Sequence, residues 1–285
     1  MPYIQTQSGY TFHYFLPSFK ETLDRSKPTI LLLHPRIFDL HVLDPQLQCT
    51  ELSSKYNLLG VDIHWHGKTK VPMDDDIFDY DRVTRELLEV MDALNVDRFH
   101  IFGVQLGAIL GIRMAIVQPK RIISLMLCST PPPKEEAENV QQYKVMREVC
   151  RNDAGDGTDS IPLEIVAAGR WIYFGNHKDA ALFPEWLKTS NLKASNQPYV
   201  HKFFSSLIYR RPLTDEEWAA VTCPVLLIHG DDDHVYPTEA AHKNRKMLSN
   251  ASVELHILKG APMFCSYTHP REVNALCIDF LQNLT

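Results

Sequence analysis

A sharp turn at residues 103–107 constrains the fold of this chain more than any other feature of its sequence. A strand-like run at 99–102 leads into the turn, Gly103 and Gly107 bracket it, and an apolar helix is predicted over residues 105–117. Glycines at this spacing permit a crowded, strained strand-to-helix turn. The residue at the tip is Gln105, whose carboxamide is not deprotonated near neutral pH and is a very poor nucleophile. The segment therefore predicts a βα unit with a polar, non-nucleophilic tip.

Strand-like and helix-like segments alternate on both sides of this turn. Continuous apolar runs are typical of strands buried on both faces of a parallel sheet, whereas apolar residues at helical spacing predict the helices between them. The predicted strands are 29–34, 57–63, 99–102, 122–128, 224–229 and 253–258, and the predicted helices are 44–55, 80–94, 105–117, 238–248 and 272–281. This order predicts an α/β fold, a doubly wound, mostly parallel sheet with helices on both faces.

The alternation stops at the three prolines 131–133 and resumes only after residue 214. We therefore predict a core formed by residues 1–130 and 215–285, and a helical cap insertion formed by residues 131–214. An insertion at this point lies over the carboxyl ends of the strands, where such sheets keep their binding sites. The cap is rich in aromatic residues, most of which are expected to form its own core. Trp171 is the cap residue that we predict to contact a substrate.

Five motifs occur in an order that resembles the α/β-hydrolase fold superfamily in its single-cap form. They are residues 34–35, 62–69, 97–108, 229–237 and 259–263, and the resemblance covers about residues 25–130 and 215–285. It implies an α/β-hydrolase sheet with a cap over an active-site cleft.

The same resemblance assigns catalytic positions, and two of them hold unsuitable residues. By register with the family, Gln105 is at the nucleophile position, Met263 is at the general-base position and Asp233 is the acid. Methionine has no titratable proton, so it cannot activate a nucleophile. In a measured serine protease, losing the nucleophile or the base costs on the order of a million-fold in rate. The triad is therefore predicted to be degenerate and hydrolysis by it is not expected.

Other candidate site residues follow from the same motifs. The backbone N–H groups of Leu106 and Arg36 are the predicted oxyanion-hole donors, although Pro35 fixes the backbone beside Arg36. The Arg36 side chain is interpreted either as a clamp on a carboxylate or enolate or as an arginine turned to solvent. Leu106, Arg36, Met263 and Trp171 are thus the predicted substrate-binding residues.

Gln105 and Asp233 are the candidate catalytic residues, and each has an alternative interpretation. The Gln105 amide either orients a bound ligand or is inert after loss of the triad. Beside the Met263 thioether, Asp233 is expected to be desolvated and protonated, as a lone acid or base. The alternative is a carboxylate that accepts hydrogen bonds from loop N–H groups.

Three functions are compatible with these residues. The first is a non-hydrolytic catalyst (a cyclase, isomerase, lyase or decarboxylase) that acts on a hydrophobic small molecule in a capped pocket. The alternative is a non-catalytic ligand receptor or partner-binding pseudohydrolase. The third is a hydrolase whose nucleophile has moved, for example to Cys265 or Ser266. Whether the protein is an enzyme is thus left open.

The composition of the chain indicates which classes of partner and cofactor are not expected. The net charge is −6 without a basic patch, so no nucleic acid is expected. No apolar run approaches the roughly 18 residues that span a bilayer, and no secretory signal is visible, so we predict a cytoplasmic protein without a membrane partner. The six cysteines include no C-x-x-C pair or His–Cys cluster, and the chain has no phosphate-binding loop. We therefore expect no metal and no organic cofactor. The oligomeric state is not predicted by the sequence, and a homodimer is one possibility.

Overall fold

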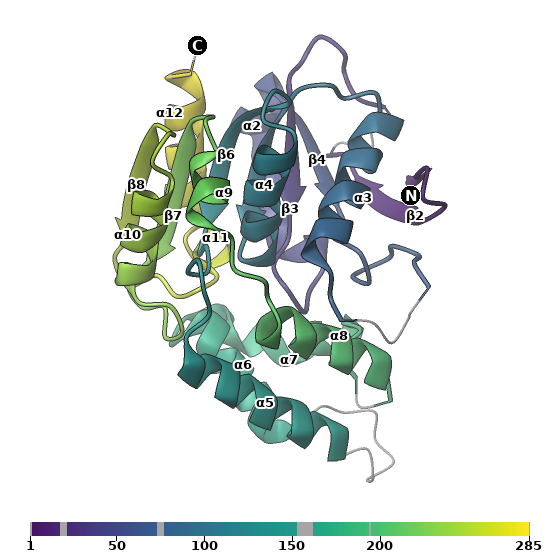
Figure 1. Ribbon diagram of the computed structural model, residues 1–285, viewed down its shortest axis with the longest axis vertical. Helices are drawn as coiled ribbons and strands as arrows, with labels where there is room; N and C mark the ends of the chain where they lie inside the picture. Colours follow the sequence, from purple (N-terminus) through teal and green to yellow (C-terminus); the bar gives the residue numbers. More distant parts are fainter. Residues whose placement is uncertain (1, 18–21, 73–76, 153–161, 194, 285) are drawn as a thin grey trace.

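The centre of the molecule is a mostly parallel sheet. The computed structural model describes residues 2–17, 22–72, 77–152, 162–193 and 195–284, and its eight strands follow the order β1-β2-β4-β3-β5-β6-β7-β8 (Figure 1). Their bounds are Tyr3–Gln5 (β1), Thr11–Phe15 (β2), Thr29–Leu33 (β3), Asn57–Val61 (β4), Phe99–Val104 (β5), Ile122–Cys128 (β6), Val225–Gly230 (β7) and Val253–Leu258 (β8). Strands β3 to β8 run parallel, while β1 and β2 join the β4 edge as an antiparallel pair.

The helices fall between and beyond the strands. They are η2 (Leu40–Leu43), α1 (Asp44–Leu47), α2 (Thr50–Lys55), α3 (Tyr80–Ala93), α4 (Leu106–Val117), α5 (Ala137–Asn152), α6 (Leu163–Phe174), η3 (Lys178–Leu182), α7 (Phe183–Thr189), α8 (Gln197–Ile208), α9 (Asp215–Ala219), α10 (Thr238–Met247), α11 (Cys265–Thr268) and α12 (Pro270–Gln282). Within the described ranges, no helix has both the length and the apolar content needed to cross a membrane.

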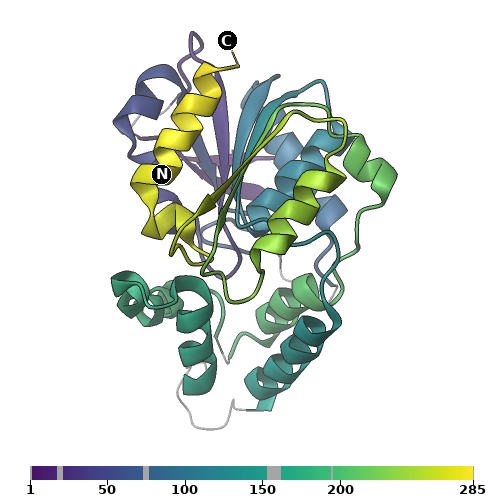
Figure 2. The same ribbon diagram turned by 90° about the vertical axis from the view of Figure 1, so that its left-hand side faces the viewer.

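The sheet is covered on both faces because its strands are apolar on both sides. In β3, Leu31 and Leu33 pack into one hydrophobic cluster, and Ile30 and Leu32 pack into the other. Successive side chains of a strand point to opposite faces, so a continuous apolar run requires cover on each. Figure 2 shows this arrangement, with the yellow helix α12 on one face and the yellow-green helix α10 on the other.

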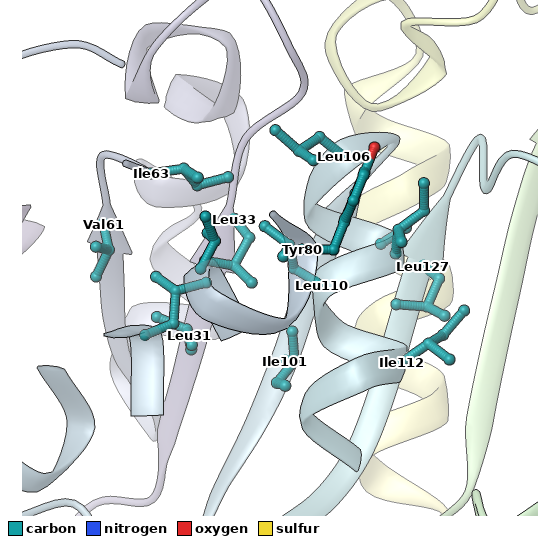
Figure 3. Packing of buried hydrophobic residues seen from close by; sticks show 14 of the residues in the cluster. Leu31, Leu33, Val61, Ile63, Tyr80, Ile101, Leu106, Leu110, Ile112 and Leu127 are labelled. Atoms are coloured by element: carbon teal, nitrogen blue, oxygen red, sulfur yellow. The ribbon is translucent and has the colours of Figure 1, made fainter. Parts of the chain in front are cut away.

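Helix α4 lies at the centre of one of these faces. Its residues from Leu106 to Ala115 are all buried, as expected for a helix that is apolar on every side. Figure 3 shows Leu106, Leu110 and Ile112 of this helix among the side chains of the neighbouring strands. This packing fixes the start of α4, and hence the turn that precedes it, against the sheet.

Helices α5 to α8 form a separate group beyond one end of the strands, as both ribbon views show (Figures 1 and 2). The chain leaves the sheet after β6 and returns to it through α9 and β7, so the group lies at the carboxyl ends of the strands. We refer to α5–α8 as the helical cap. The division of the chain into a core and a cap over an active-site cleft stays a prediction.

Two local features differ from the sequence analysis. The helix predicted over 44–55 is wrong in detail, because the chain forms the short helices α1 and α2 with Cys49 in an extended conformation between them. The pair β1–β2 was not predicted. In β2 the polar residue His13 is buried like its apolar neighbours, and its Nδ1 is hydrogen-bonded to Asp62 at 2.7 Å. The strand therefore does not show the usual alternation of buried apolar and exposed polar residues.

Candidate functional site

The turn between β5 and α4 has the strained geometry that its glycines indicate. Gln105 adopts φ 49° and ψ −97°, a region that non-glycine residues rarely occupy and that is found mainly at functional sites. A Cβ at Gly103 would lie 2.5 Å from the carbonyl oxygen of Gly107, and one at Gly107 would lie 2.2 Å from that of Leu33. Both positions therefore require glycine, and Gln105 is held at the tip between them.

The Gln105 carboxamide is bonded to the protein at both of its ends. Its Oε1 accepts a hydrogen bond from the backbone N–H of Arg36 at 3.3 Å, and its Nε2 donates to the Met263 sulfur at 3.5 Å. The side chain is 3 % exposed. One of the two predicted oxyanion-hole donors is thus already occupied by Gln105 itself.

The Arg36 side chain is buried beneath the cap, so the interpretation as an arginine turned to solvent is wrong. Its Nε donates to Ser206 Oγ at 3.0 Å and its Nη2 donates to Tyr80 Oη at 2.5 Å. Burial alone would lower the pKa of Arg36, but Tyr80, Tyr236 and Glu135 together raise it. The guanidinium is therefore charged.

Asp233 is buried in the loop after β7 with one oxygen unpartnered. Its Oδ1 accepts hydrogen bonds from the N–H groups of Val235 and Tyr236, both at 2.9 Å. Its Oδ2 has no hydrogen-bond partner among the described residues, and the Nε2 of His229 lies 3.8 Å from it. Burial raises the pKa of Asp233, against the effect of His229 and the two N–H groups. The hydrogen bonds from loop N–H groups are thus present at Oδ1, whereas a protonated Asp233 that acts as a lone acid or base stays a prediction.

A narrow apolar cavity lies between the cap and these loops. From the sheet side it is lined by Ile37, Gln105, Val235 and Met263, and from the cap by residues of α5, α6, α7 and α8. Among its lining residues the polar side chains are Gln105, Tyr143 and Tyr173. The volume of the cavity is about 50 Å³. A few waters would fill it, at about 10–15 Å³ each. It suits a slender chain or a small ring.

The structure brings some predicted site residues to this cavity and not others. Gln105 and Met263 line it, whereas Arg36, Leu106 and Asp233 lie behind its wall. Trp171 is 51 % exposed and stacks on His234, with ring centroids 3.8 Å apart, outside the cavity. The structure therefore does not support the predicted substrate contact of Trp171.

Sequence reasoning missed the cap residues that do line the cavity. Tyr143, Ile165, Leu187 and Phe203 come from four different helices of the cap. Their helical apolar spacing was the available signal, but the direction each helix faces depends on how the cap folds back on the sheet. Ile37 was also missed, although it lines the cavity with a φ of 76° that is unusual for a β-branched residue.

The remaining titratable groups near the site have structural contacts. His34 donates from Nδ1 to the Pro35 carbonyl and accepts from the Ile63 N–H at Nε2, and burial lowers its pKa. A hydrogen bond from the Cys128 thiol lowers the pKa of Cys265. Cys265 and Ser266 are fully buried and are not among the residues that line the cavity.

Nothing in the described ranges of the chain forms a metal centre, since no three His, Cys, Asp or Glu side chains are grouped to hold an ion. The side chains that line the cavity supply an amide, two phenols and a thioether in apolar surroundings.

Comparison with known proteins identifies both a family and a fold. A sequence model described as the Ndr family matches residues 47–282. The chain is 24 % identical to the uncharacterized carboxylesterase nap of Bacillus subtilis (strain 168), over 98 % of this chain and 85 % of that protein. It is 22 % identical to human epoxide hydrolase 4, over 98 % of this chain and 77 % of that protein.

Solved structures show the same fold. A hydrolase from Pseudomonas aeruginosa PA01 superimposes with a TM-score of 0.77 at 22 % identity, covering 98 % of this chain and 97 % of that one. The enol-lactonase from Burkholderia xenovorans LB400 also has a TM-score of 0.77, at 18 % identity, covering 99 % and 100 % of the two chains. The predicted α/β-hydrolase fold is confirmed.

Proposed function

The chain belongs to the Ndr family, and we propose that it binds a slender apolar molecule beneath its cap without hydrolysing it. The relatives named above as a carboxylesterase and a lactonase make hydrolysis the default expectation for this fold. The residue types at the site of this chain argue against that expectation.

The contact between Gln105 and Met263 carries the proposal. The family resemblance places these two residues where a hydrolase has its nucleophile and its general base, and their side chains touch at 3.5 Å. Neither an amide nor a thioether takes up a proton near neutral pH, so the pair cannot activate water or form an acyl-enzyme. What is left at this place is an apolar cavity in which Gln105 is one of the few polar side chains.

Binding is better supported than catalysis because the cavity offers few reactive groups. Asp233, the candidate acid, lies behind Val235 and is not among the lining residues. We therefore place the receptor before the non-hydrolytic catalyst, which reverses the order favoured by the sequence. A cyclase, isomerase, lyase or decarboxylase is the second candidate, and the unpartnered Oδ2 of Asp233 is the observation that favours it. A hydrolase using Cys265 or Ser266 is not favoured, because both residues are fully buried and neither lines the cavity.

Hexan-1-ol tests the binding site, because its chain is slender enough for the cavity. We expect saturable binding to the wild-type protein by isothermal titration calorimetry. Ile165→Trp fills the cavity from α6 and is expected to weaken binding at least about tenfold, an effect of roughly 1.4 kcal/mol.

Leu163→Trp is the matched control, since Leu163 is on the same helix but is 80 % exposed and does not line the cavity. This variant is expected to bind hexan-1-ol like the wild type. Equal affinities for the two tryptophan variants, or no saturable binding to the wild type, would contradict the proposed site.

A further inference from the structure

Arg36 is a buried cation without a counter-ion of its own. Its side chain is 1 % exposed, and its two hydrogen bonds go to the neutral hydroxyls of Ser206 and Tyr80. Among the described residues, its Nη1 has no hydrogen-bond partner and no carboxylate forms an ion pair with it. A buried charge in this state is costly, by several kcal/mol before any compensation.

Glu135, the carboxylate that raises the pKa of Arg36, is already paired with another arginine. Glu135 Oε2 accepts from Arg210 Nη2 at 3.1 Å and from the Tyr236 hydroxyl at 3.2 Å, and both side chains of the Glu135–Arg210 pair are 5 % exposed. Its other oxygen accepts from Asn139. The buried region formed by Arg36, Arg210 and Glu135 therefore holds two positive charges and one negative charge.

Arg36 is connected to the residues that line the cavity. The backbone N–H of Arg36 holds Gln105, which lines the cavity, and its guanidinium bonds Ser206, the residue before Leu207 in the α8 wall. Burial raises the pKa of Tyr173, another lining residue, to about 12; the charge of Arg36 acts in the opposite direction and that of Asp233 in the same direction as burial. A ligand in the cavity is thus within reach of the charge of Arg36, which forms no ion pair among the described residues.

We propose that the natural ligand is an apolar molecule ending in a carboxylate, and that this carboxylate supplies the counter-ion missing at Arg36. The inference rests on the proposed binding function and names its ligand class. A carboxylate oxygen accepts a charge-assisted bond from Nη1, the one guanidinium nitrogen without a partner. It also replaces the Gln105 carbonyl at the Arg36 N–H, which leaves the Gln105 amide free to turn toward the ligand.

Three six-carbon probes that differ only in their end group test this assignment on the wild-type protein. Hexanoate is expected to bind at least about tenfold more tightly than hexan-1-ol at pH 7.5, since a hydrogen bond to a charged group is stronger than one between neutral groups. Hexylamine, a cation, is expected to bind most weakly of the three. If hexan-1-ol binds as tightly as hexanoate, the carboxylate assignment is overturned while the cavity itself stands; if none of the three binds, both fail.

Arg36→Met locates the effect, because methionine keeps much of the buried stem without the charge. This variant is expected to lose the preference for hexanoate over hexan-1-ol. Arg113→Met is the matched control: Arg113 is equally enclosed but pairs with Asp81 at 2.5 Å, away from the cavity, so its loss is expected to leave the preference unchanged. A preference that survives in Arg36→Met would overturn the assignment, and if that variant does not fold, the ranking on the wild type decides.

Discussion

At the scale of single residues, the site is defined by polar groups that are held in place but incompletely paired. Gln105 is fixed at both ends of its amide, Arg36 has one free nitrogen and Asp233 has one free oxygen. Unpaired buried polar atoms are uncommon in folded proteins and call for an explanation. Other buried polar atoms of the described residues are also unpaired. We assign Arg36 and Asp233 to ligand binding because the loops that carry them also carry the cavity-lining residues Ile37 and Val235.

The unpaired oxygen of Asp233 has a measurable consequence for stability. Because burial raises the pKa of this carboxyl above its ordinary value of 3.8, the folded state holds the proton more tightly than the unfolded state. Its contribution to stability is then complete below pH 3.8 and is lost as the pH rises through the folded pKa. Asp233→Asn cannot titrate and keeps an oxygen for the Val235 and Tyr236 N–H groups, so its stability relative to the wild type is expected to increase from pH 4 to pH 7.

Urea unfolding of both proteins at several pH values in this range measures the difference. Asp232→Asn, on the same loop and with a side chain that is 42 % exposed, controls for the loss of a loop charge. His229 and His234 are the neighbouring groups that lower the pKa of Asp233. If the stability difference is constant or falls with pH, they outweigh burial and our assignment of Asp233 is wrong.

The sequence predicted where the site residues lie in the fold better than it predicted which residues surround them. Motif order was enough to bring Gln105 and Met263 together, because both follow strands that end at the same edge of the sheet. The burial of Arg36 was not predictable, since it depends on Ser206, which lies 170 residues further along the chain. The exposure of Trp171 was missed for the same reason: aromatic content shows that a cap has a core but not which side chains enter it.

At the scale of elements, Arg210 joins the two segments that connect the cap to the sheet. Its Nη2 donates to the Pro132 carbonyl at 2.9 Å and to Glu135 at 3.1 Å, so the outgoing and returning segments are held together by one side chain. Arg210→Ala leaves Glu135 buried without its partner and is expected to lower the free energy of unfolding by about 3 kcal/mol. Amides of α5 and α8 are expected to exchange faster by hydrogen–deuterium exchange mass spectrometry.

Arg211 is the matched control for this change. It is adjacent in sequence, but its ion pair with Glu217 is on the surface and its side chain is 49 % exposed. Arg211→Ala is expected to cost less than about 1 kcal/mol and to leave exchange in the cap unchanged. Similar effects of the two substitutions on cap exchange would show that Arg210 does not hold the cap.

Elements of the core were predicted closely, whereas those of the cap were not resolved. The β6 run has the same bounds in the sequence and in the structure, because a buried apolar run ends where its polar neighbours begin. In the cap, α5 is largely exposed and weakly apolar, and its position depends on contacts with α8 more than on its own pattern. The interruption of the βα alternation predicted where the cap lies in the sequence, but not the bounds or packing of its helices.

At the scale of the whole molecule, this chain keeps the architecture of the α/β hydrolases while its site carries different side chains. The sheet, the strained turn after β5 and the loop acid Asp233 are all present. On our account, Gln105 and Met263 have removed acyl-transfer chemistry from this scaffold and left a ligand chamber. Restoring the two side chains is then expected to restore reactivity, because a stable fold supplies the remaining geometry.

Intact-mass analysis after incubation with diisopropyl fluorophosphate tests this claim most directly. We predict that the wild-type protein gains no mass, and that the double variant Gln105→Ser, Met263→His gains a single phosphoryl group on the peptide that contains position 105. The single variant Gln105→Ser is expected to react far more slowly, since its hydroxyl has no base. An adduct on the wild-type protein, or a double variant that folds with the wild-type melting temperature and yet gains no mass, would contradict the account.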